Sequence, residues 1–149
     1  MRLLMGHLIG TVRRALGTGN STSTRQIPHV VTDIADDELA ETYAWDAGRV
    51  RAAWSPLAAT DEVTAPWGPC RAEAAARGFA LETLAHGWDL AVATGQPPNL
   101  DDVAQRCLEN AGPEIVPDRL RGVMYDPPRR PNEDSATERL VHLLGRKRP

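Results

Sequence analysis

Apolar and polar residues alternate along most of the chain with the spacing of amphipathic helices. Over residues 36–54, apolar positions recur every three or four residues, at Leu39, Tyr43, Ala47, Val50 and Trp54. Such spacing places them on one side of an α-helix, where they pack together. The same kind of pattern predicts helices over residues 2–16, 71–94 and 100–111, a short helical piece over residues 114–121, and a last helix between Ser135 and Gly145.

Segments without this periodicity separate the helices. Residues 17–31 mix Gly, Ser, Thr and Pro, which predicts a mobile loop, and residues 57–70 predict a connection with a short extended piece that turns at Gly68. Residues 122–134 are polar and rich in proline, as is typical of a surface linker. We therefore expect an all-α, up-and-down bundle over residues 1–121, a linker over residues 122–134, and a C-terminal helix with a basic tail over residues 135–149.

Length and charge narrow the class of protein. A chain of 149 residues with 42% hydrophobic content is long enough for one domain with its own core. The net charge of -3 gives no electrostatic footprint for nucleic acid. No apolar run approaches the roughly 20 residues that span a bilayer, so we expect no membrane partner and a cytoplasmic location.

A carboxylate and an imidazole lie one helical turn apart in the segment FALETLAHGWDLAVATG, at residues 79–95. Residues four apart share one face of a helix, so Glu82 and His86 can both reach one metal ion. A weak surface contact without metal is the plainer explanation of such a pair. His7, on the inward side of the first predicted helix, offers a third ligand. Two imidazoles and one carboxylate suit Zn²⁺ and leave a fourth position open, although Ni²⁺ also fits.

Three further side chains are candidates for the surroundings of this site. Asp89 lies three residues after His86 and is expected to accept a hydrogen bond from it, because metal-bound imidazoles usually donate their other N–H to such a group. Trp67 and Trp88 are candidate walls of a pocket. For Trp67, a hydrophobic plug at the end of the bundle explains the residue equally well.

The motifs HLIG near the start, ETLAHGWDLAVATGQP in the middle and ATERLVHLLGR near the end resemble a known family. They are similar to the metal-binding relatives of mycothiol-dependent maleylpyruvate isomerase, within the DinB-like helical-bundle superfamily. The resemblance implies a DinB-like bundle that binds a divalent metal through His7, Glu82 and His86. It also implies a thiol transferase or isomerase that uses mycothiol as thiol cosubstrate and acts on an electrophilic small molecule.

One departure from the family pattern affects these expectations. Relatives usually carry a further helix before the first metal-binding histidine, whereas only six residues precede His7. A bundle lacking one wall would expose an apolar strip, so we expect a homodimer through the first helix. The alternatives to a thiol-dependent enzyme are a metal-binding bundle without catalysis and a protein-interaction bundle.

Overall fold

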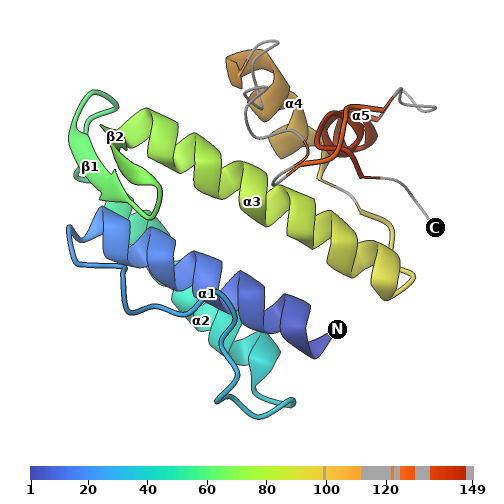
Figure 1. Cartoon of the computed structure of the whole chain (residues 1–149), viewed down its shortest axis with the longest axis horizontal. Coiled ribbons are helices and arrows are strands. Elements are labelled where there is room, and N and C mark those ends of the chain that lie inside the picture. Colours follow the sequence, from blue (N-terminus) through green and yellow to red (C-terminus); the bar gives the residue numbers. More distant parts are fainter. Residues whose placement is uncertain (99, 112–121, 123–124, 130–134, 147–149) are drawn as a thin grey trace. The chain divides into compact units, whose positions relative to one another are not determined.

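The computed structural model describes residues 1–98, 100–111, 122, 125–129 and 135–146, and Figure 1 shows the whole chain. In this part of the chain the elements are α1 (Arg2–Gly19), α2 (Leu39–Trp54), β1 (Glu62–Ala65), β2 (Gly68–Arg71), α3 (Ala72–Ala93), α4 (Asp101–Ala111) and α5 (Ala136–Leu143). The expected helical piece at 114–121 lies outside the described residues. These helices and strands confirm the predicted mainly helical fold and add a small two-stranded sheet to it. None of the described helices is both long and apolar enough to cross a membrane.

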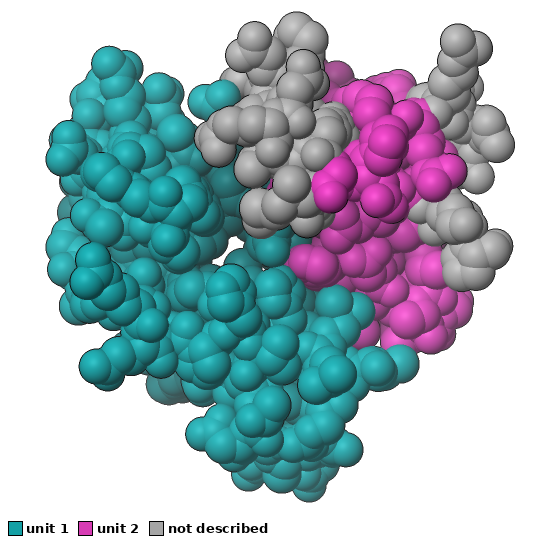
Figure 2. All heavy atoms as spheres, viewed as in Figure 1, with its two compact units in different colours: residues 1–83 teal, residues 84–149 magenta. Residues whose placement is uncertain are grey.

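The chain forms two compact units, residues 1–83 and residues 84–149, which are coloured separately in Figure 2. The division falls inside α3, between Thr83 and Leu84, while the boundary that composition places after residue 121 stays a prediction. The first unit contains α1, α2, the two strands and the first half of α3. The second contains the second half of α3 with α4 and α5.

Residues 20–38 pack closely along α1, in contrast to the mobile loop expected over residues 17–31. The helix continues past Gly17 to Gly19, and the backbone N–H of Val31 donates a 3.0 Å hydrogen bond to the carbonyl of Gly6. A Cβ atom on Gly10 would lie only 2.7 Å from the carbonyl oxygen of Pro28. Glycines in α1 thus leave room for a second stretch of backbone, a tertiary effect that loop composition does not reveal.

Helices α1 and α2 run in the same direction, so the predicted up-and-down arrangement is wrong for this pair. At their starts, the guanidinium of Arg2 forms an ion pair with Asp36, just before α2. At their ends, the indole N–H of Trp54 donates a 2.9 Å hydrogen bond to the carbonyl of Ala15. The parallel arrangement follows from the packed segment 20–38, which is long enough to return the chain to the start of α1.

The predicted extended piece forms one strand of a short antiparallel hairpin. Strand β1 pairs with β2 so that Val63 faces Cys70, and Gly68 at the turn has a φ of +123°, which glycine adopts without strain. Val63 and Ala65 are buried against Ala72 and Ala75 at the start of α3. The hairpin therefore fixes where α3 begins.

In the second unit, one carboxylate joins the starts of α4 and α5. Ser135 caps α5, as its sequence predicted, and its hydroxyl also donates a 2.7 Å hydrogen bond to Asp101 at the first position of α4. The same Asp101 oxygen accepts from the backbone N–H and the hydroxyl of Thr137, at 2.9 and 2.6 Å. These hydrogen bonds lower the pKa of Asp101 to about 2, so it remains ionised at neutral pH.

Candidate metal centre

His7 and Glu82 meet within the first unit, one from α1 and the other from α3. The Nε2 atom of His7 lies 3.2 Å from Oε1 of Glu82. Both side chains are mostly buried, with exposed fractions of 20% and 29%. Burial of ionisable groups is costly unless they are paired or bind a cation. The contact between His7 and Glu82 therefore differs from a weak contact between exposed side chains on the surface of a helix.

The other ring nitrogen of His7 indicates which nitrogen can serve as a ligand atom. Nδ1 lies 3.1 Å from the carbonyl oxygen of His29, and a carbonyl only accepts hydrogen bonds, so Nδ1 carries the proton. In a neutral imidazole, Nε2 then has a lone pair, which faces the Glu82 carboxylate. Two acceptors face each other favourably only with a cation between them. Either a second proton on the ring or a metal ion satisfies this arrangement.

His86 lies one turn beyond Glu82 in the same continuous helix, and it shows the same division of its ring nitrogens. Its Nδ1 atom lies 3.0 Å from Oδ2 of Asp89, which in turn accepts a 3.4 Å hydrogen bond from Arg146 after α5. With Nδ1 bound to Asp89, Nε2 of His86 is the nitrogen that can serve as a ligand atom, in the carboxylate–histidine arrangement common in metal sites. The contact predicted between Asp89 and His86 is present, while its role at a metal stays a prediction.

The lowered pKa of Asp89 agrees with its position as hydrogen-bond acceptor for His86. Burial would raise the pKa of this carboxyl group, but hydrogen bonds from His86 and Arg146, together with the positive charge of Arg146, outweigh the effect of burial. The pKa is therefore lowered from its ordinary value. An ionised Asp89 is a strong acceptor for the Nδ1–H of His86.

His7, Glu82 and His86 each offer one ligand atom, and these atoms lie within 4.8 Å of one another. Ligand atoms about 2.1 Å from a tetrahedral Zn²⁺ are separated from each other by about 3.4 Å. The His7–Glu82 separation of 3.2 Å matches this spacing, and the His86 atom lies within 4.8 Å of both. The donor set therefore fits one divalent ion.

The two tryptophans have packing partners of their own. Trp67 lies in the hairpin turn with its ring centroid 5.0 Å from that of Phe79, and it covers Gly78 on α3. Trp88 is buried and donates a 3.0 Å hydrogen bond to the buried carboxylate of Glu138 on α5. Trp88 is therefore part of the core, whereas Trp67 packs on α3 with 56% of its surface exposed, and the roles of both as pocket walls stay predictions.

Sequence reasoning did not identify the backbone carbonyl of His29 or the side chain of Arg146. A carbonyl has no residue-specific signal, and three basic residues at 146–148 are typical of a solvated chain end. Arg14 was also missed: it is buried on α1, where the charge of Glu82 partly offsets the lowering of its pKa by burial. An arginine within the apolar pattern of the first helix was the one available signal for it.

No protein-family model matches this chain, and neither a curated protein nor a solved structure matches it with significance. The resemblance to the mycothiol-dependent family thus remains an interpretation of its motifs. The support for a function comes from the chain's own residues.

Proposed function

We propose that this chain binds one divalent metal ion through His7, Glu82 and His86 and that the ion serves to activate a small thiol. The observation that carries the proposal is the orientation of the two imidazoles. Each has its Nδ1 atom engaged, by the His29 carbonyl and by Asp89, so that the Nε2 atom of each can bind metal beside one carboxylate.

The ligand set favours Zn²⁺, with Ni²⁺ as the alternative. Two nitrogens and one oxygen from the protein leave at least one coordination position open, which is typical of catalytic rather than structural zinc sites. A metal ion with an open position supplies thiol activation, because a thiol that coordinates it is deprotonated outright, whereas a free thiol with a pKa near 8.5 is mostly protonated at neutral pH.

The protein residues have separate roles in this proposal. His7, Glu82 and His86 bind the ion, while Asp89 and the His29 carbonyl hold the two imidazoles in one tautomer and orientation. The hydrogen bond from His86 and the charge and hydrogen bond of Arg146 lower the pKa of Asp89 against the effect of burial. The thiol is mycothiol if the motif resemblance holds, and the reaction is then a thiol transfer or an isomerisation on an electrophilic small molecule in the cytoplasm.

Two other functions remain to be distinguished from this one. A non-catalytic metal-binding bundle would bind the ion without affinity for a thiol, and a protein-interaction bundle would bind neither. The predicted homodimer is compatible with all three.

The thiol proposal is tested by titrating Co²⁺-substituted protein with mycothiol while recording absorbance. Direct sulfur coordination gives a thiolate-to-cobalt band in the near ultraviolet. We expect the band with mycothiol, none with its S-methylated form, and none in a Glu82→Gln variant that does not retain cobalt. If the protein binds cobalt but mycothiol gives no band, only the non-catalytic functions remain.

A further inference from the structure

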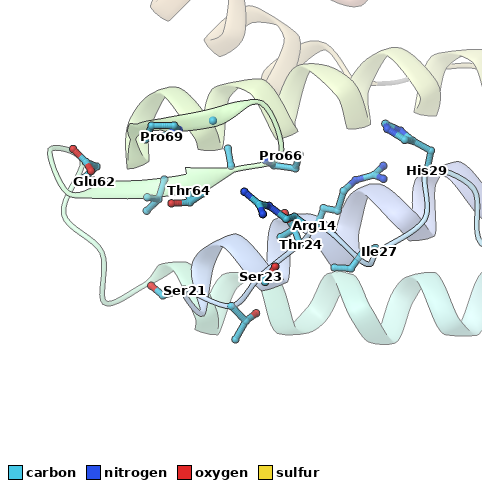
Figure 3. A pocket seen from close by; sticks show the side chains of 15 residues that line it. Arg14, Ser21, Ser23, Thr24, Ile27, His29, Glu62, Thr64, Pro66 and Pro69 are labelled. Carbon is cyan, nitrogen blue, oxygen red and sulfur yellow. The ribbon is translucent and has the colours of Figure 1, made fainter.

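A groove with a mixed polar and apolar lining is formed in the first unit by the segment after α1 and by the β-hairpin. Its volume is about 640 Å³, and Figure 3 shows the residues that line it. One wall comes from residues 21–29, the other from residues 62–69, and Arg14 reaches it from α1. None of the three metal ligands lines this groove.

Arg14 is a buried cation with unused hydrogen-bond donors. Only 6% of its surface is exposed, and two of its five N–H groups donate to the carbonyl of Pro28 and the hydroxyl of Thr11, at 3.1 and 3.4 Å. None of the ion pairs found among the described residues includes its guanidinium, and the charge of Glu82 only partly offsets the effect of burial on the Arg14 pKa. Buried charges are normally paired, and Glu82 compensates Arg14 only in part, so the three remaining donors at the wall of a groove point to a further anionic partner.

The rest of the groove adds charge and hydrogen-bonding capacity of the kind that an anion needs. Arg25 lies exposed at its rim, and hydroxyls are contributed by Ser21, Ser23 and Thr64. The one acidic lining residue, Glu62, lies at the end of the groove away from Arg14 and His29 in Figure 3. The acidic residue of the lining is therefore separated from Arg14.

We propose that this groove binds the oxyanion group of a small molecule, a carboxylate or a phosphate, with Arg14 as its anchor. A guanidinium presents pairs of parallel N–H groups that match either oxyanion, and its burial strengthens each hydrogen bond. Arg25 attracts the ligand from the rim, and the hydroxyls of the 21–29 segment complete its coordination. The site needs no metal ion, so it goes beyond the function proposed above.

Nuclear magnetic resonance of metal-free protein tests this site at a single atom. Inorganic phosphate and acetate are titrated separately while the Nε–Hε signal of Arg14 and the amide signals of residues 21–25 are followed, with sodium chloride of equal ionic strength as the reference. We expect saturable shifts with a dissociation constant on the order of 1 mM for the preferred anion. The anion that gives the tighter binding identifies the chemical class.

Three variants make the result specific. Arg14→Lys keeps the charge but loses the paired donors, so we expect about tenfold weaker binding. Arg25→Gln, an exposed change, should weaken binding roughly two- to fivefold. Arg49→Gln on the exposed side of α2 removes the same charge outside the groove and should change nothing.

Shifts no larger than those with chloride would overturn the proposal. So would equal weakening in Arg25→Gln and Arg49→Gln, because that would indicate general charge attraction. If Arg14→Lys does not fold, the Arg14 Nε signal in the parent protein and the comparison of the two exposed variants still decide the question. His86→Ala should retain anion binding while losing metal, which separates failure of this site from failure of the metal centre.

Discussion

His7 and Glu82 are 75 positions apart in the sequence, yet Nε2 of one lies 3.2 Å from Oε1 of the other. The contact depends on two separate features of the first unit. The hairpin sets where α3 begins, and the packed segment 20–38 supplies the His29 carbonyl that orients the His7 ring. Residues far from the ligands should therefore affect metal binding.

Gly10 allows the close approach of a second backbone segment to α1, so a side chain there should disturb the site. In Gly10→Ala, the added Cβ would lie 2.7 Å from the Pro28 carbonyl oxygen and 3.0 Å from that of His29. Because both neighbours are backbone, the segment must shift. We expect unfolding in urea to show a loss of about 1–3 kcal/mol and metal affinity to fall, since His29 orients His7.

Gly48→Ala is the matched control for this substitution. Gly48 lies within α2, and a Cβ there would meet nothing within 4 Å. Alanine in an exposed helix interior is favoured over glycine by about 0.8–1.0 kcal/mol, so this variant should be more stable with unchanged metal affinity. Destabilisation of the same size in both variants would contradict the role given to Gly10.

Replacing Asp89 should weaken metal binding without removing a ligand. In Asp89→Ala, the Nδ1–H of His86 loses its acceptor, and the ring is no longer held in one tautomer. Changes of this kind typically lower metal affinity by roughly 10–100-fold, which competition with a chromophoric chelator measures. Asp37→Ala removes an exposed carboxylate just before α2 and serves as the charge control. An unchanged affinity in Asp89→Ala would show that Asp89 does not orient His86.

Asp101 should make the second unit sensitive to acid. Its pKa is about 2 in the folded chain and 3.8 in the reference state, so folding favours the ionised form. This stabilisation is fully present above pH 3.8 and is lost as the pH falls through about 2. Asp101→Asn keeps an acceptor but does not titrate, so the stability difference between parent and variant should shrink over that interval. Circular dichroism with urea unfolding at several pH values measures it, and a pH-independent difference would contradict this account.

Helix α3 was predictable from the sequence, and so was the placement of Glu82 and His86 one turn apart on it. Both depend only on neighbours within one or two helical turns. The last helix and its Ser135 cap were predictable for the same reason. The parallel arrangement of α1 and α2 was not, since it depends on how residues 20–38 pack against glycines of α1. Such packing leaves no periodic pattern. The link from Asp101 to Thr137 was likewise hidden, because it joins residues 36 positions apart.

The metal content of purified protein tests the central claim most directly. Protein prepared without chelator or a nickel column should contain about one divalent ion per chain by elemental mass spectrometry, because three protein ligands suffice for a site of this type. The His7→Ala, Glu82→Ala and His86→Ala variants should each lose it. His29→Ala should retain it, since only the backbone carbonyl of that residue is used. Metal content equal to that of the parent in all three ligand variants would contradict the account.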